Sequence, residues 1–141
     1  MMEEITMLKL IIGVKGTGKT KTLINLVNSA SEVTKGDVVC IEKGVKLRYD
    51  IKPTVRLIDV DEYMVADAQS LYGFVAGILA SNHDVTDLFI DSTLKICKGD
   101  IPAFEELVVE LDKLIEKIGL NMVMTVSMPE EDVSDVVKKY V

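Results

Sequence analysis

The chain has 141 residues, of which 48% are hydrophobic and 28% charged, and its formal net charge is −7. This length fits one domain over residues 1–141, and the balance of apolar and charged residues excludes a disordered chain. The negative charge argues against general binding to nucleic acids or anionic membranes, because affinity for a phosphate backbone is largely electrostatic.

A strand, a glycine-rich loop and a helix are predicted at the start of the chain. Residues 7–12 form a short apolar run that is typical of a buried strand. In residues 19–30 the apolar side chains recur at the three- and four-residue spacings of one helical face. The residues between them, 13–20, read GVKGTGKT. The glycine-rich loop therefore connects a strand to a helix.

The next segment predicts an antiparallel hairpin inserted at an edge of the sheet. Val38 to Ile41 is an apolar run, and residues 45–52 alternate strictly between apolar and charged side chains. Lys43 and Gly44 suit a tight turn between these two strands. Lysines on such an edge discourage edge-to-edge aggregation, although a basic hairpin face could also hold an acidic partner.

The rest of the chain alternates between strands and helices. Strands are predicted within residues 54–63, 86–92 and 120–127, and helices over 67–80 and 101–118. The longer helix has Asp100 as a cap, Pro102 in its first turn and Gly119 as its stop, and a short acidic helix is predicted in the tail. This order predicts a single-domain α/β fold with a mostly parallel central sheet flanked by helices.

Two further features predict a reduced, cytoplasmic protein. The apolar stretch 8–14 is interrupted by Lys9 and Gly13, so it is neither a signal peptide nor a membrane span. Cys40 and Cys97 are too few and too isolated for a disulfide framework or a metal cluster.

The glycine-rich loop matches the pattern G-x-x-x-x-G-K-[ST] at all four fixed positions. In such a loop the glycines let backbone N–H groups turn towards a β-phosphate, and the helix N-terminus adds partial positive charge. The lysine reaches the β- and γ-phosphates and so assists catalysis, and the threonine hydroxyl binds Mg²⁺. The predicted nucleotide-binding residues are Gly13, Lys15, Gly16, Thr17, Gly18, Lys19, Thr20 and Lys21.

A carboxylate at the end of a neighbouring strand has to complete the magnesium site. Asp91 follows an apolar run in LFIDS, and Asp59 follows a similar run in VRLID. Asp91 is favoured because its position leaves room for an intervening strand and a crossover helix. With Asp59 the link from the strand at 38–41 would contain no crossover helix, which we expect parallel pairing to need. Thr20 and Asp91 are thus the predicted metal ligands, with Asp59 as the alternative to Asp91.

On the motifs GVKGTGKT and LFIDS the sequence resembles the P-loop NTPases, and it is more distantly similar to small bacterial ATP-binding proteins labelled twitching-motility-like. The resemblance implies that the first and last strands are neighbours and that the Asp91 strand comes next. This order leaves the P-loop strand at an edge, unless the tail or a second copy in a homo-oligomer covers it.

In the division of this superfamily with an inserted strand, a glutamate directly follows the magnesium aspartate, whereas Ser92 stands there in this chain. Hydrolysis would then need another carboxylate. The catalytic candidates are Asp61 and Glu62, at the tip of a strand that we expect beside the Asp91 strand. The same division has a γ-phosphate sensor at the end of its inserted strand, and Thr125 and Ser127 match that place.

ATP is the expected nucleotide, because the sequence TKGD at 34–37 lies too early for a guanine-reading motif and no D-x-x-G follows Asp91. The expected function is a slow Mg²⁺-dependent ATPase whose nucleotide state controls a protein partner. One alternative is an ATP-binding module that does not hydrolyse ATP, because Ser92 replaces the glutamate. Another is a small-molecule kinase, although Arg48 and Arg56 are the only arginines available to clamp a second phosphorylated substrate.

Overall fold

The computed structural model of the chain describes residues 7–141 and contains a five-stranded sheet in the order β1-β5-β4-β2-β3. All four pairs of neighbouring strands are parallel. The predicted order of the first strand, the last strand and the Asp91 strand is therefore correct, whereas the strand expected on the other side of the Asp91 strand is not its neighbour. The strands are β1 (Leu8–Gly13), β2 (Asp37–Glu42), β3 (Arg56–Asp59), β4 (Val85–Ile90) and β5 (Asn121–Ser127).

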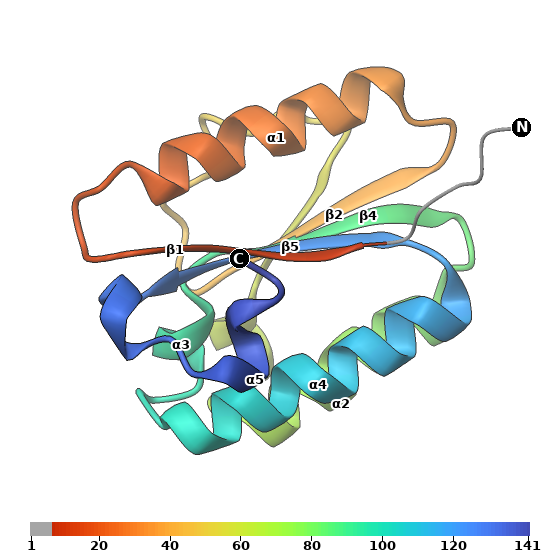
Figure 1. Ribbon diagram of the computed structural model, residues 1–141. Coiled ribbons are helices and arrows are strands. Elements are labelled where there is room, and N and C mark those ends of the chain that lie inside the picture. The colour runs from red at the N-terminus through yellow and green to blue at the C-terminus, as the bar shows by residue number, and fades with distance from the viewer. Residues whose placement is uncertain (1–6) are drawn as a thin grey trace, which may run out of the picture.

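Helices cover both faces of this sheet (Figure 1). Helix α1 (Lys19–Val33) lies on one face, and α2 (Ala68–Ser81) and α4 (Ile101–Ile118) lie side by side on the other. The short elements are η1 (Val60–Tyr63), α3 (Thr93–Ile96), η2 (Glu130–Asp132) and α5 (Asp135–Lys138). Among the described residues, no helix combines the length and the hydropathy that crossing a membrane requires.

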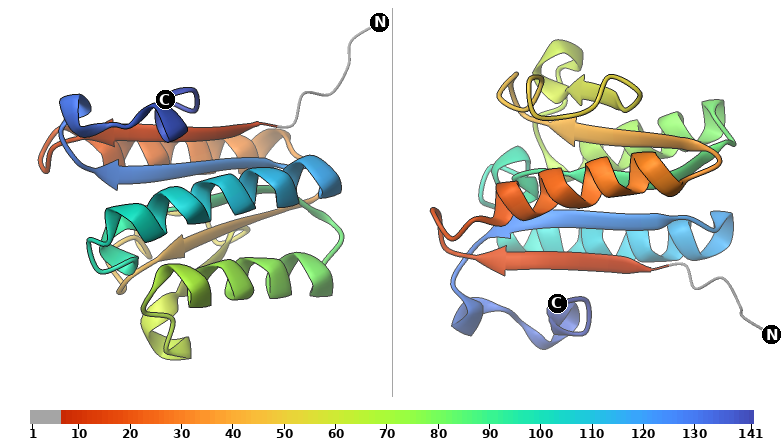
Figure 2. Two further views of the ribbon diagram at one scale, coloured as in Figure 1. Left: turned by 60° about the horizontal axis from the view of Figure 1, so that its bottom comes forward. Right: turned by 90° about the horizontal axis from the view of Figure 1, so that it is seen from above.

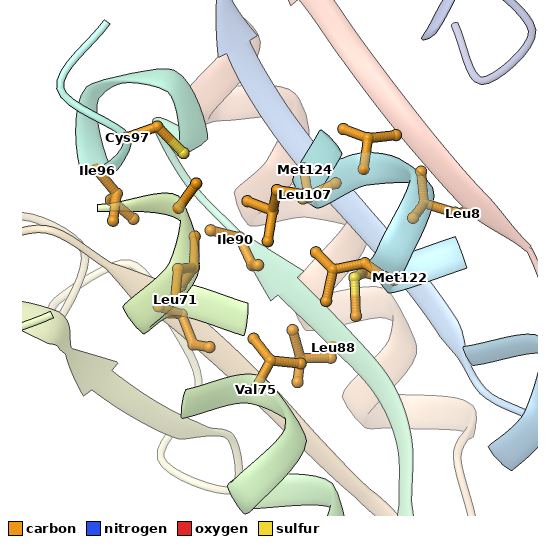
Figure 3. Packing of buried hydrophobic residues seen from close by; sticks show 14 of the residues in the cluster. Leu8, Leu71, Val75, Leu88, Ile90, Ile96, Cys97, Leu107, Met122 and Met124 are labelled. Carbon is orange, nitrogen blue, oxygen red and sulfur yellow. The ribbon is translucent and has the colours of Figure 1, made fainter. Parts of the chain in front are cut away.

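The larger of two apolar clusters fills the space between the sheet and helices α2 and α4. The central strands β4 and β5 are buried on both faces, so they are nearly continuous apolar runs rather than alternating ones. Phe104 and Leu111 of α4 are fully buried in this layer. Figure 3 shows the side chains of Leu71, Val75, Leu88, Ile90, Leu107, Met122 and Met124 in the cluster.

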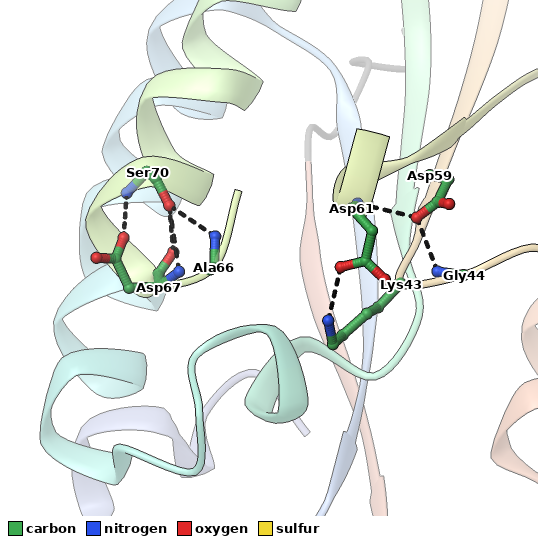
Figure 4. Close-up of polar contacts among 7 residues, drawn as sticks. All are labelled: Lys43, Gly44, Asp59, Asp61, Ala66, Asp67 and Ser70. Carbon is green, nitrogen blue, oxygen red and sulfur yellow. Dashed lines mark hydrogen bonds and ion pairs between the residues drawn. The ribbon is translucent and has the colours of Figure 1, made fainter. Parts of the chain in front are cut away.

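Residues close in the chain determine where α2 begins and where α4 begins and ends. Asp67 and Ser70 form a reciprocal capping box at the start of α2, in which each side chain accepts from the other residue's backbone N–H (Figure 4). The side chain of Asp100 accepts from Ala103 N at 3.1 Å, and Gly119 ends α4 with φ at 90°. The predicted cap and stop of the long helix are thus confirmed.

The predicted hairpin is wrong, because residues 43–55 contain turns and no strand. Leu47 and Ile51 are buried, whereas Val45 is 53% exposed and Tyr49 is 88% exposed. Ile51 N donates to Leu47 O at 3.1 Å, a helical type of turn that puts residues four apart on one side. The alternation of apolar and charged residues is therefore satisfied by a turn that packs two side chains against α1.

The expectation that a parallel link requires a helix is also wrong. Strands β2 and β3 pair in parallel, and the irregular segment 43–55 connects them. This segment is long enough for a crossover, and it lies on the same face as α1, where it is anchored by Asn28. The amide of Asn28 donates to Asp50 O at 2.8 Å and accepts from Lys52 N at 3.0 Å.

Replacing Asn28 with alanine is expected to lower the free energy of unfolding by about 1–3 kcal/mol, because Lys52 N and Asp50 O lose their side-chain partner. Chemical denaturation measures this loss. The matched control is Asn121→Ala, at an exposed position at the start of β5, which is expected to cost less than 1 kcal/mol. Equal losses in the two variants would contradict the anchoring role of Asn28.

The C-terminal tail covers part of the β1 edge (Figure 2). Leu10 N donates to Tyr140 O at 2.8 Å, and Tyr140 Oη donates to Asp112 Oδ2 on α4 at 2.6 Å. Burial, together with this hydrogen bond to Asp112, raises the pKa of Tyr140 to about 12. Of the two predicted ways to cover the β1 edge, the tail or a second copy, the structure shows the tail. A homo-oligomer stays a prediction.

Candidate functional site

A cleft of about 590 Å³ lies at the carboxyl ends of the strands, between the glycine-rich loop 13–20, the segment after β2 and the segment after β4. In parallel α/β sheets ligands bind at this edge. The cleft is lined by Lys15, Gly16, Gly18, Lys19, Thr20, Lys21, Glu42, Lys43, Lys46, Leu47, Asp91, Ser92, Leu94, Lys95, Gly99, Thr125 and Ser127.

The glycines of the loop between β1 and α1 are required by its geometry. Gly16 and Gly18 have φ values of 87° and 82°, in the left-handed region that strains other residues. A Cβ atom on Gly13 would lie only 2.7 Å from Thr17 Oγ1. The Thr17 hydroxyl itself donates to Val14 O at 2.8 Å, so Gly13 and Thr17 shape the loop although neither lines the cleft.

Helix α1 begins directly at the cleft. Its N-cap residue, Gly18, makes no side-chain capping bond, which leaves the backbone N–H groups of the first turn available to an anion. Lys19 Nζ folds over the loop and donates to Val14 O at 2.9 Å. The loop therefore combines an uncapped helix N-terminus with a lysine ammonium group.

The structure brings Thr20 and Asp91 together. Thr20 Oγ1 donates to the two carboxylate oxygens of Asp91 at 3.2 and 3.3 Å, and Asp91 is only 8% exposed. Asp59 lies elsewhere, at the end of the edge strand β3, where it accepts from Gly44 N at 2.8 Å and Asp61 N at 2.9 Å (Figure 4). Of the two alternative aspartates, only Asp91 lines the cleft.

Thr20 and Asp91 fit the chemistry of a magnesium site. Mg²⁺ takes oxygen ligands and is commonly held by one or two carboxylates together with substrate phosphates and water. The Thr20 hydroxyl and the Asp91 carboxylate, in hydrogen-bond contact beside the glycine-rich loop, supply two such oxygens. The donor set therefore suits Mg²⁺ bound jointly with a polyphosphate.

Thr125 is a direct partner of Asp91. Its buried hydroxyl donates to Asp91 Oδ1 at 2.7 Å and accepts from Ser92 N at 2.7 Å. Both hydrogen-bonding roles of this hydroxyl are thus used within the protein, and Thr125 acts on the cleft by orienting Asp91. Ser127, at the end of β5, is exposed and lines the cleft itself.

Sequence reasoning missed Glu42, which ends β2 beside Asp91. The two strands are adjacent, and Asp91 N donates to Ile41 O at 2.9 Å. Glu42 is 3% exposed and accepts from Lys46 N at 3.0 Å and from Leu47 N at 3.3 Å. Burial raises the pKa of Glu42 above its usual range, although the two backbone bonds oppose this shift.

Asp61 and Glu62 are not at the place that we predicted. Strand β2 lies between β3 and β4, so the tip of β3 is not beside Asp91. Asp61 pairs with Lys43, and neither Asp61 nor Glu62 lines the cleft. A signal for Glu42 exists in the sequence, because VVCIE has the same apolar run followed by an acid as LFID and VRLID. The hairpin interpretation obscured this signal, because it followed the apolar run Val38 to Ile41 with a tight turn at Lys43 and Gly44 and gave Glu42 no role.

The cleft is basic although the whole chain is acidic. Six of the lining residues are lysines, against two carboxylates, while the chain has a net charge of −7. The lysines are Lys15, Lys19, Lys21, Lys43, Lys46 and Lys95. This concentration of positive charge favours an anionic ligand.

No protein-family model matches the chain, and no curated protein matches it. Among solved structures 189 chains match, including a KaiC-like protein from the hyperthermophilic archaeon Pyrococcus horikoshii OT3. That similarity has a TM-score of 0.68 at 16% identity and covers 95% of this chain and 67% of the other. It shows a shared fold, and the predicted single-domain α/β fold with a mostly parallel central sheet flanked by helices is thereby confirmed, apart from the hairpin.

Proposed function

We propose that the cleft binds ATP together with Mg²⁺ and hydrolyses the ATP slowly. The observation that carries this proposal is the contact of Thr20 Oγ1 with the Asp91 carboxylate at 3.2 Å, at the start of a helix that follows a glycine-rich loop. The basic lining of the cleft supports the same ligand class, because a triphosphate is polyanionic.

Each part of the site has a role in this proposal. The backbone N–H groups of the loop and the first turn of α1 receive the phosphate oxygens, and Lys19 leaves Val14 O to contact the β- and γ-phosphates. Thr20 and Asp91 would hold Mg²⁺, which neutralises charge that develops on the phosphates. Thr125 keeps the Asp91 carboxylate oriented.

Glu42 is the carboxylate best placed to orient water for attack on the γ-phosphate. It lies beside Asp91 in the cleft, and its raised pKa makes it a better proton acceptor than an exposed glutamate. Glu42 would thus do the work of the glutamate that follows the magnesium aspartate in the resembling proteins, a position that Ser92 occupies in this chain. Asp61 and Glu62 have no such position.

The wider role that we propose is control of another protein, or of a second copy of this chain, by nucleotide state. Strand β3 is an edge strand, and Tyr63 and Met64, at the end of the η1 turn that follows it, are 52% and 90% exposed. These features support an interaction near β3. Co-purification from the native source, with ATP or ADP present, tests whether a partner is retained by one nucleotide only.

A non-hydrolysing ATP-binding module is the second candidate, and the contacts of Glu42 favour it. Two backbone N–H groups hold its carboxylate, and a carboxylate tied in this way is less free to orient water. Phosphate release separates the candidates. Release from ATP alone supports the hydrolase, tight binding without release supports the module, and release only with an acceptor supports a small-molecule kinase.

The metal assignment predicts that Asp91→Asn reduces the Mg²⁺-dependent part of ATP affinity by about tenfold, because one charged metal ligand is lost. Asp59→Asn is the matched control, because Asp59 lies at the end of β3 and does not line the cleft. Titration with a fluorescent ATP analogue, with and without Mg²⁺, measures the effect. A loss of Mg²⁺ dependence in Asp59→Asn alone would contradict the assignment.

A further inference from the structure

Lys43 belongs to two parts of the structure. It follows Glu42 at the end of β2 and lines the nucleotide cleft. Its Nζ atom lies 2.6 Å from Asp61 Oδ1, on the η1 turn after the edge strand β3 (Figure 4). Asp61 does not line the cleft, so this ion pair draws the ammonium group away from the place where phosphates would bind.

The backbone that follows Lys43 is anchored at two places. Gly44 has φ at 109°, and its N–H donates to Asp59 Oδ1 at 2.8 Å. Further along, the N–H groups of Lys46 and Leu47 donate to the Glu42 carboxylate. Rotation of the Lys43 side chain can therefore change its partner without a rearrangement of the loop.

A bound triphosphate would compete well with Asp61 for Lys43. The side chains of Lys43 and Asp61 are 33% and 48% exposed, and exposed ion pairs are weak because solvent screens them. A γ-phosphate offers more charge and more acceptor oxygens than one carboxylate. On the proposed role of Glu42 in water attack, the γ-phosphate is the phosphate nearest to Glu42 and to its chain neighbour Lys43, and a diphosphate lacks that group.

We infer that the Lys43 ammonium group leaves the Asp61 carboxylate and binds the γ-phosphate when a nucleoside triphosphate occupies the cleft. The cleft thereby distinguishes a nucleoside triphosphate from a diphosphate. This inference rests on the proposed nucleotide binding and adds a selectivity residue to it. Asp61 acts as the competitor that holds Lys43 when no triphosphate is bound. Because Asp61 belongs to η1, this exchange also breaks the ion pair that connects the cleft to the turn after β3.

The test compares the dissociation constants of ATP and ADP, measured calorimetrically with Mg²⁺ for wild type, Lys43→Gln, Asp61→Asn and the double variant. Lys43→Gln is expected to weaken ATP binding by about tenfold, the cost of one charge-assisted contact, and to leave ADP within about twofold. Asp61→Asn is expected to tighten ATP binding by about two- to fivefold, because the competing ion pair is removed. That gain should vanish in the double variant.

The matched controls are Lys113→Gln and Glu110→Gln, which make the same charge changes in an exposed ion pair on α4 outside the cleft. Both are expected to keep the affinities for ATP and ADP within about twofold of wild type. Equal losses for ATP and ADP in Lys43→Gln, or a gain from Asp61→Asn that persists without Lys43, would overturn the inference alone. Failure of the wild type to bind either nucleotide would overturn the proposed function as well.

Discussion

Lys19→Ala is expected to weaken Mg²⁺-dependent ATP binding by about 100-fold while leaving the fold intact. The ammonium group is the most direct cation for the β- and γ-phosphates, and a charge-assisted contact of this kind stabilises binding by up to about 3 kcal/mol. The fold should survive, because Lys19 is only partly buried and its ammonium group bonds to Val14 O of its own loop.

Titration with a fluorescent ATP analogue measures this loss, and thermal unfolding without nucleotide checks the fold. The matched control is Lys9→Ala, which removes the same side chain from an exposed position on β1 outside the cleft. Lys9→Ala should bind ATP as the wild type does. If Lys19→Ala did so too, at matched Mg²⁺, the phosphate-loop assignment would be wrong.

Glu42→Gln is expected to slow phosphate release by about 100-fold or more while ATP affinity stays within a few fold of wild type. A carboxylate that accepts a proton from the attacking water contributes about 10²–10⁴-fold to a rate, and an amide of the same shape cannot accept that proton. A fall in the rate without a fall in affinity indicates the loss of an interaction made only in the transition state.

The pH dependence of release provides an independent readout for Glu42. Burial raises the folded-state pKa of this carboxyl above its usual range, so the wild-type rate should fall as the pH is lowered through that raised pKa. Glu42→Gln should lack this decline. Glu62→Gln is the matched control, because Glu62 is exposed and does not line the cleft. Loss of release in Glu62→Gln, with none in Glu42→Gln, would restore the carboxylate predicted from sequence.

The same pKa shift predicts how stability changes in Glu42→Gln. The folded state binds the Glu42 proton more tightly than the unfolded state, so this group favours folding at low pH, and that contribution is lost as pH rises through the raised pKa. Above that pH the wild type carries a buried charge that glutamine lacks. Denaturation at pH 8 should therefore find the variant at least as stable as the wild type, which separates a catalytic loss from unfolding.

Several features of the protein were determined by the sequence alone. The conformation of the glycine-rich loop 13–20, the cap and stop of α4, and the aspartate after β4 could be predicted because each depends on residues that are close in the chain. Gly16 and Gly18 supply left-handed backbone wherever the loop lies, and Asp100 caps α4 through the N–H of Ala103 three residues on. Such contacts form within one element and need no distant partner.

The tertiary structure alone decided where Glu42, Lys43 and Asp61 lie. Alternating apolar and charged residues suit a strand, but they equally suit a turn that buries Leu47 and Ile51 four residues apart. The side chain of Asn28 on α1 anchors that turn, and this contact joins segments that no local pattern connects. Once β2 and β3 pair in parallel, β2 separates β3 from β4. Glu42, rather than Asp61 or Glu62, therefore lies beside Asp91. Strand order is set by long-range packing, which local sequence patterns do not show.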